Sequence, residues 1–183
     1  MKEKFKQWLR GGAAEEAAFS TRILMVCTGN ICRSPTAEGV LRAKLEHAGL
    51  HGQVQVDSAG TQGYHTSEAP DARAVRAAAQ RGYQIGKIRA RPIRDQDFHD
   101  FDWLLAMDQS HLDWLLKRAP PDSRGRVALL MPLARVRKGV LEVPDPYYGG
   151  PPGFEHVLDL VEDASDGVVA RLLAGVPLAG LTP

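Results

Sequence analysis

The sequence predicts an α/β protein built as a three-layer sandwich, in which a four-stranded parallel sheet carries helices on both faces. Short apolar runs of strand length alternate along the chain with longer segments that place apolar residues at helical spacing. The chain has 183 residues, 44% of them hydrophobic, which is enough for one sizeable core. Neither an internal repeat nor a second alternating block is visible, so we expect one sheet.

The first strand and helix surround the most informative stretch. Residues 22–27, RILMVC, form a short apolar run that ends in a cysteine, and residues 34–50 then show helical spacing. Ser34 and Pro35 form a helix-start signal, because serine can cap the free amides and proline fits the first turn.

The second strand and helix follow the same order. Residues 53–61 alternate polar and apolar side chains, as a half-buried strand does. After a polar loop, Pro70 precedes a helix-like segment over residues 71–82, which stops at Gly82.

The remaining elements complete the alternating pattern. Residues 101–108 read as a third buried strand, residues 110–119 as a helix, and residues 125–131 as a fourth strand. A proline-rich loop over 132–153 leads to an amphipathic helix over 154–175. We therefore expect a parallel sheet of flavodoxin-like strand order, with ligands bound beyond the carboxyl ends of its strands.

The two ends of the chain lie outside this pattern. Residues 1–21 begin with a short basic amphipathic stretch and lack the apolar region of a secretory signal. We expect a frayed or surface-docked extension there, with a weak membrane or partner anchor as the alternative. The folded domain is then predicted to span 22–175, and residues 176–183 to form a loose tail.

Composition excludes several classes of protein. The formal net charge is +1, so no nucleic-acid partner is expected and any anion site must be local. No run of about 18 apolar residues is present, so no membrane span is expected. The chain has two cysteines, Cys27 and Cys32, which favours a reduced, cytoplasmic setting. A second Cys or His pair near them is missing, so no metal and no cofactor is expected.

The stretch VCTGNICRS carries the chemistry. Five residues separate Cys27 from Arg33, namely Thr28, Gly29, Asn30, Ile31 and Cys32. A loop of this length can curl so that its backbone amides face inward as an anion nest, while the arginine presents a planar fork to two phosphate oxygens. The glycine and the asparagine tolerate the positive φ angles that such a loop needs.

A thiol in this field is expected to be ionised and nucleophilic. Cys27 would sit beside an arginine and at the positive end of a helix, where cysteines lose their proton readily. The Ser34 hydroxyl could donate a hydrogen bond to the sulfur. A thiolate at the floor of a phosphate site is placed for in-line attack on phosphorus, which predicts phosphoryl transfer through a cysteinyl-phosphate.

The leaving oxygen needs a proton donor, and the stretch EVPDPYYGG offers one. Prolines on both sides of Asp145 stiffen its backbone, which suits a carboxylate that must be aimed. Tyr147 and Tyr148 follow at once and could form the wall of a cleft for an aromatic phosphoester.

These motifs resemble the low-molecular-weight protein tyrosine phosphatases. VCTGNICRSPTAEG, the late DPYYG, and the intervening DSAG and MD segments agree with that family in kind and order, over residues 22 to about 174. The resemblance implies that Cys27 is the nucleophile, Arg33 the phosphate clamp and Asp145 the general acid and later the base.

The resemblance also implies supporting roles. Asn30, Ser34 and Ser58 would shape the loop. Tyr64 would occupy a place in the substrate wall, and Cys32 would form a reversible disulfide with Cys27 on oxidation. Two features depart from the family pattern: Ile88 falls near a position where some members have a histidine that braces the loop asparagine, and residues 1–21 have no counterpart.

Other functions remain open at this stage. A protein arginine phosphatase shares the fold and loop but has a small threonine where this chain has Ile31, whose bulk favours a flat phenyl ring. An arsenate reductase would need further cysteines for its disulfide relay. A redox-sensing phosphate-binding module without turnover would be expected to lack Asp145.

The partner expected from the resemblance is a phosphotyrosine-containing protein, with a bacterial tyrosine kinase as one candidate. A monomer or a weak dimer is expected. Asp57 and Asp108 are interpreted as scaffold residues near strand ends, as Ser58 is when taken alone. Three histidines are expected at the surface without a chemical role: His65, His99 and His111.

Overall fold

The computed structural model describes residues 20–178 of the chain. The predicted N-terminal extension therefore lies outside the described residues except for its last two positions, as does most of the predicted C-terminal tail. The domain boundaries stay a prediction.

The described residues form one four-stranded sheet whose strands are all parallel. Its strands are β1 (Thr21–Cys27), β2 (Val54–Gly60), β3 (Trp103–Ala106) and β4 (Val127–Leu129). Their order across the sheet is β2-β1-β3-β4. This arrangement confirms the predicted flavodoxin-like order.

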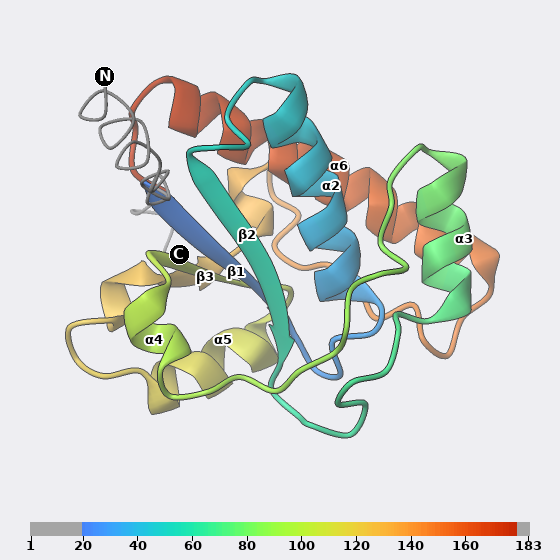
Figure 1. Cartoon of the computed structure of the whole chain (residues 1–183), viewed down its shortest axis with the longest axis horizontal. Coiled ribbons are helices and arrows are strands. Elements are labelled where there is room, and N and C mark those ends of the chain that lie inside the picture. Colours follow the sequence, from blue (N-terminus) through green and yellow to red (C-terminus); the bar gives the residue numbers. More distant parts are fainter. Residues whose placement is uncertain (1–19, 179–183) are drawn as a thin grey trace, which may run out of the picture.

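Helices cover both faces of the sheet (Figure 1). One layer contains α2 (Arg33–His47), α3 (Ala72–Gln80) and α6 (Pro151–Leu173). The other contains α4 (Asp97–Asp100) and α5 (Gln109–Arg118). Two hydrophobic cores result, one on each face, as a three-layer sandwich requires.

Several element boundaries differ from the sequence prediction, and one helix was not predicted. The helix predicted from residue 154 begins earlier, at Pro151, because a proline in the first turn gives up no helical hydrogen bond. The strand predicted over 101–108 is shorter, and Asp108 caps α5 by accepting a hydrogen bond from the His111 N–H. The short helix α4 was not predicted, since four polar and aromatic residues carry no readable helical period.

The fold brings the cysteine-containing loop to the carboxyl edge of the sheet. Strand β1 ends at Cys27, and α2 begins at Arg33. Residues 27–33, called the cysteine loop from here on, therefore join the end of a buried strand to the positive end of a buried helix. This is the place where parallel α/β sheets bind ligands.

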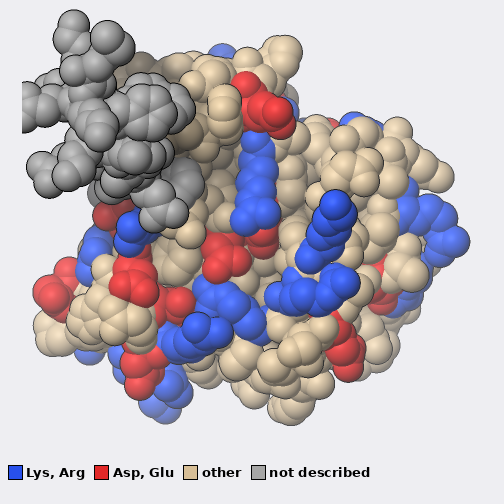
Figure 2. All heavy atoms as spheres, viewed as in Figure 1, with Lys and Arg blue, Asp and Glu red and all other residues tan. Residues whose placement is uncertain are grey.

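Basic side chains gather on the face of the molecule shown in Figure 2. The connection between α3 and α4 crosses this face and carries exposed Lys87, Arg89 and Arg94. Its backbone is joined to the loop after β2, because the Ser67 N–H donates to the Ala90 carbonyl at 2.7 Å. Within residues 20–178, no helix has the length and apolar character needed to cross a bilayer.

Candidate active site

The sulfur of Cys27 lies in a nest of donors. The Asn30 N–H donates to Sγ at 3.3 Å, and the Ser34 hydroxyl oxygen lies 3.0 Å from Sγ. Asn30 also donates its side-chain amide to the same Ser34 oxygen at 2.9 Å. The serine oxygen therefore accepts from Asn30 and is left with its own proton to donate to the sulfur.

Asn30 is the residue that folds the cysteine loop. It is fully buried and has a φ angle of 57°, in the left-handed region that asparagine tolerates. Its side-chain Nδ2 also donates to Ser58 Oγ at 2.8 Å, and its side-chain Oδ1 accepts a hydrogen bond from the Arg91 backbone N–H at 3.0 Å. A backbone N–H, that of Arg91, thus braces the side chain of Asn30.

A buried carboxylate ends this chain of hydrogen bonds. Ser58 donates to Glu38 Oε2 at 2.5 Å, and Arg42 pairs with the other oxygen of Glu38 at 2.8 Å. Burial raises the pKa of Glu38, and the Ser58 hydrogen bond and the Arg42 charge oppose that rise. Ser58 therefore links the loop to α2, a more specific position than a general scaffold residue.

The loop also leaves backbone donors free. Within residues 20–178, the N–H groups of Gly29, Ile31, Cys32 and Arg33 donate to no acceptor. Free amides in a tight loop at the head of a helix form an anion-binding nest. Their position around Cys27 agrees with the phosphate cradle expected from the sequence.

Arg33 lines the same pocket as Cys27 and is held from two sides. Its side chain is 5% exposed, and Nη1 donates to Asp108 Oδ2 at 2.6 Å while Nη2 donates to Asp145 Oδ2 at 3.1 Å. Asp108 is ionised: burial works to raise its pKa, but the His111 ring and the Ser110 hydroxyl lower the pKa below its ordinary value. The Asp108 carboxylate therefore fixes the guanidinium of Arg33. The sequence interpretation of Asp108 as a scaffold residue missed this role.

The prediction that His111 lies at the surface is wrong. The residue is 2% exposed, and its Nε2 lies 2.8 Å from the Thr28 hydroxyl oxygen in the cysteine loop. His111 lies in the first turn of α5, and its ring turns toward the cysteine loop. By contrast, His99 is exposed, as predicted, and His65 is half-buried at the pocket rim.

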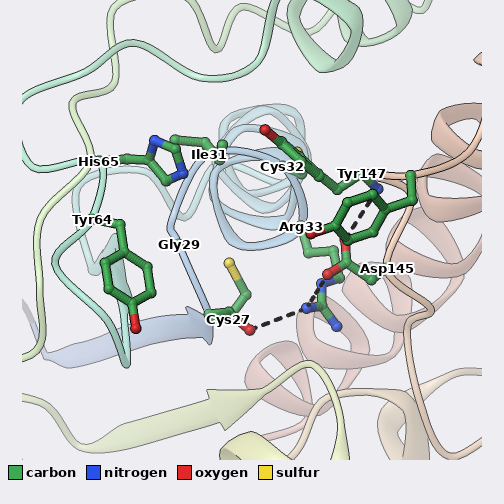
Figure 3. A pocket seen from close by; sticks show the side chains of 11 residues that line it. Cys27, Gly29, Ile31, Cys32, Arg33, Tyr64, His65, Asp145 and Tyr147 are labelled. Carbon is green, nitrogen blue, oxygen red and sulfur yellow. Dashed lines mark hydrogen bonds and ion pairs between the residues drawn. The ribbon is translucent and has the colours of Figure 1, made fainter.

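A pocket of about 290 Å³ opens above Cys27. Figure 3 shows its sulfur pointing into the pocket, with Tyr64 and His65 on one side and Arg33, Asp145 and Tyr147 on the other. The pocket lining includes most of the predicted site residues, namely Cys27, Thr28, Gly29, Ile31, Cys32, Arg33, Tyr64, Asp145, Tyr147 and Tyr148. Three predicted residues lie buried beneath its floor, namely Asn30, Ser34 and Ser58.

The second cysteine differs from the first in its surroundings. Both thiols are free and buried, and both line the pocket. Burial, assisted by the negative charges of Asp71 and Cys27, raises the pKa of Cys32 to about 12. Cys32 is therefore protonated at neutral pH.

Gly60 is a site residue that the sequence interpretation did not single out. A Cβ atom at this position would lie 2.6 Å from the Thr28 carbonyl oxygen and 2.9 Å from the Gln62 carbonyl oxygen. Only glycine lets the end of β2 approach the cysteine loop this closely. Its position could have indicated this role, because Gly60 is the last residue of the DSAG segment and lies at the end of a predicted strand.

The arrangement combines a sulfur nucleophile, an anion nest, a clamped arginine and a carboxylate at the pocket edge. Within residues 20–178, no group of three or more His, Cys, Asp or Glu side chains is placed to hold a metal ion. Together with the sheet order, these features define a cysteine-dependent phosphatase.

Comparison with known proteins identifies the family. The family model described as low molecular weight phosphotyrosine protein phosphatase matches residues 22–177. A low molecular weight protein-tyrosine-phosphatase of Streptomyces coelicolor is 46% identical over 153 residues, covering 82% of this chain and 93% of that protein. A low molecular weight phosphotyrosine protein phosphatase of Schizosaccharomyces pombe is 42% identical, over 73% of this chain and 85% of that protein.

Solved structures agree. A crystal structure of a protein tyrosine phosphatase from Entamoeba histolytica, with Hepes in its active site, superposes with a TM-score of 0.82 at 39% identity. The match covers 85% of this chain and 99% of the other. The chain therefore belongs to the low molecular weight protein-tyrosine-phosphatase family, in which Cys27 fits the cysteine nucleophile and Arg33 the phosphate clamp.

Proposed function

We propose that the protein hydrolyses phosphotyrosine in proteins through a phosphate ester of Cys27. The observation that carries this proposal is the sulfur of Cys27 at the pocket floor, facing the Asn30 N–H and the Ser34 hydroxyl. These donors stabilise a negative sulfur. The free amides of the cysteine loop and the fork of Arg33 bind the phosphate oxygens around it.

In the first step, the sulfur attacks phosphorus as the bond from phosphorus to the tyrosine oxygen breaks. That oxygen takes a proton from Asp145, so the leaving group departs as neutral tyrosine. Asp145 is 48% exposed at the pocket edge, which lets it meet a leaving group above the phosphate. Asp145 is paired with Nη2 of Arg33, the same nitrogen that would bind a phosphate oxygen. Phosphate binding therefore displaces the Asp145 carboxylate from the arginine.

In the second step, Asp145 accepts a proton from water as the water oxygen attacks phosphorus. The bond between sulfur and phosphorus breaks, inorganic phosphate leaves, and the negative sulfur is restored. Arg33 and the loop amides hold the phosphate in both steps, and such preorganised donors are worth most in a site with little water.

The pocket walls favour a flat aromatic leaving group. Tyr64 is 78% exposed and Tyr148 is 94% exposed, so both project at the pocket mouth, and Tyr147 packs edge to face on Tyr148 with the ring centroids 5.0 Å apart. Ile31 forms part of the lining and narrows the slot at the position that is threonine in arginine phosphatases. These apolar walls support phosphotyrosine over phosphoarginine.

A panel of phosphotyrosine, phosphoserine and phosphoarginine peptides tests the proposal, with free phosphate as the readout. We expect turnover of phosphotyrosine alone, its loss in Cys27→Ser, and a gain of phosphoarginine turnover in Ile31→Thr. Equal or faster hydrolysis of phosphoarginine by the wild-type protein would contradict the assigned substrate.

We propose a cytoplasmic protein as the substrate, one in which acidic residues flank the phosphotyrosine. A bacterial tyrosine kinase is one candidate. Exposed Lys87, Arg89 and Arg94 support this, because their loop is hydrogen-bonded to the loop that carries Tyr64 at the pocket mouth. Positive charge beside a phosphate pocket attracts acidic residues that flank a phosphotyrosine. The protein would act as a monomer or a weak dimer.

Redox control is a second part of the proposal. Both thiols line one pocket, so oxidation of Cys27 to a sulfenic acid would let the Cys32 sulfur displace hydroxide and close a disulfide. Because the pKa of Cys32 is about 12, this closure should be slow at neutral pH and should accelerate as pH rises. Peroxide should then inactivate the wild-type protein reversibly and Cys32→Ser irreversibly; equal recovery of the two would exclude Cys32.

A further inference from the structure

His111 is buried beside the phosphate clamp, and the reaction steps above give it no part. It is 2% exposed, in the first turn of α5, on the face of the sheet opposite α2. A histidine in such a place must satisfy two ring nitrogens within the protein, since little water reaches it. Each nitrogen lies next to a residue that contacts Arg33.

The contacts form a closed circuit of four side chains. Nε2 of His111 lies 2.8 Å from Thr28 Oγ1, and Nδ1 lies 3.0 Å from Asp108 Oδ1. Arg33 completes the circuit, since Nη1 donates to Asp108 Oδ2 at 2.6 Å and Nη2 approaches Thr28 Oγ1 at 3.4 Å. Both arms of the guanidinium fork thus rest on residues that His111 links.

The chemistry of the partners places a proton on the ring. A carboxylate offers only acceptors, so an Nδ1 lone pair that faced Asp108 would be repelled. Within residues 20–178, Nδ1 makes no hydrogen bond of good geometry, and the Asp108 carboxylate meets it as a negative charge 3.0 Å away. We therefore place a proton on Nδ1, beside the Asp108 carboxylate, which leaves Nε2 available to bond the Thr28 hydroxyl.

Thr28 connects the circuit to the pocket. It is exposed, it lines the pocket, and it follows Cys27 directly in the cysteine loop. A shift of its side chain would move both the loop and one support of the arginine fork. A misplacement of this kind near a reacting centre lowers the rate strongly.

We propose that His111 is a positioning residue for phosphate binding: through Thr28 and Asp108 it holds the two arms of Arg33 in the orientation that clamps phosphate. The proposal rests on the proposed function, because it assigns the clamp to bound phosphate. It does not give the imidazole any contact with the substrate.

Three variants separate the two contacts of the ring. His111→Gln can still reach Thr28 but loses the contact with Asp108, and His111→Asn does the reverse. His111→Leu removes both contacts. His99→Gln, an exposed histidine on the neighbouring helix α4, is the matched control.

The readouts are the affinity for inorganic phosphate by calorimetry, kcat and KM on p-nitrophenyl phosphate, and the thermal midpoint. We expect His111→Leu to weaken phosphate binding and to lower kcat/KM about tenfold or more. The Gln and Asn variants should each recover part of this loss, and His99→Gln should match the wild type. Phosphate affinity and kcat/KM at the wild-type level in a folded His111→Leu would overturn the proposal.

A mutant cycle with Thr28→Val tests the route. If His111 acts through Thr28, the effect of His111→Asn on phosphate affinity should shrink in the Thr28→Val background, because both changes remove the same contact, and the effect of His111→Gln should persist there. Additive losses from His111→Asn and Thr28→Val would contradict the route. A wild-type protein that neither binds phosphate nor turns over substrate would instead refute the proposed function itself.

The wild-type protein offers a test that needs no variant. Nitrogen–proton correlation spectra of the imidazole reveal which ring nitrogens are protonated. A proton on Nδ1 of His111 in the phosphate-free protein supports the circuit. A ring protonated on Nε2 alone would overturn it, because Nδ1 would then face the carboxylate bare.

Discussion

The Ser34 hydroxyl oxygen lies 3.0 Å from the sulfur of Cys27, and the same oxygen accepts the Asn30 side-chain amide at 2.9 Å. The asparagine therefore orients the serine proton toward the sulfur. A single polar contact from the N-terminal turn of α2 thus stabilises the negative charge that both reaction steps depend on.

Replacing Ser34 with alanine should slow catalysis without unfolding the protein. Loss of a hydrogen bond to a charged group predicts a fall in kcat/KM of roughly 10- to 100-fold. Ser165→Ala is the control, because Ser165 is also fully buried but has no hydrogen-bond partner within residues 20–178. Equal kcat/KM for the two variants would show that the serine does not act on the sulfur.

Asp145→Ala should lower kcat most for substrates with poor leaving groups. A general acid contributes about 10²–10⁴-fold, so hydrolysis of an alkyl phosphate should fall far more than that of p-nitrophenyl phosphate. The comparison is made on kcat, with exposed Asp100→Asn as the control. A uniform loss across leaving groups would argue that Asp145 only supports Arg33.

Gly60→Ala should disturb the cysteine loop from the neighbouring strand. The new Cβ would meet the carbonyl oxygens of Thr28 and Gln62 at 2.6 and 2.9 Å, so backbone has to move. Overpacking of this kind predicts a fall in the free energy of unfolding of about 1–3 kcal/mol, together with reduced activity. Gly125→Ala, which meets nothing within 4 Å, is the control in denaturant titrations. Unchanged stability and activity would mean that the loop tolerates the displacement.

Cys32 predicts a loss of stability at alkaline pH. Burial raises its pKa from an ordinary 9.0 to about 12, so the unfolded chain releases this proton before the folded protein does. The contribution of the neutral thiol to stability is therefore complete below pH 9 and is lost as the pH rises toward 12. The free energy of unfolding of the wild type should fall more steeply over this interval than that of Cys32→Ser. Parallel curves would contradict a raised pKa.

The basic loop predicts a preference for acidic phosphopeptides. Changing Lys87, Arg89 and Arg94 to glutamine should lower kcat/KM for peptides with acidic flanks and leave p-nitrophenyl phosphate unaffected, with a weaker salt dependence than in the wild type. A control with equal charge loss changes three other exposed cations, namely Lys117, Arg124 and Arg135. The same loss in both triple variants would point to net charge rather than to this loop.

Most of the fold could be predicted because each strand and each long helix carries its own periodic pattern. Strand β1 and helix α2 were readable from RILMVC and from the Ser34 and Pro35 start signal, and the alternation of elements implied a parallel sheet. The start of α6 was misplaced because Pro151 and Pro152 fit both a loop and a first helical turn.

The site was predictable where function is local in sequence. Cys27 and Arg33 share one loop, so their spacing revealed the chemistry. The supports of Arg33 and Asn30 come from distant segments, and nothing in the sequence near His111 or Arg91 shows that one ring nitrogen or one backbone N–H will reach that loop. Contacts made across the sheet edge depend on packing, which no short pattern encodes.

The central claim is that phosphate passes through Cys27, and trapping the intermediate tests it most directly. Wild-type protein mixed with p-nitrophenyl phosphate and denatured within milliseconds should carry one phosphate on the peptide that contains Cys27, as measured by mass spectrometry. Cys27→Ser treated in the same way should carry none. Steady turnover by the wild type with no phosphate on Cys27 at any time point would contradict the account.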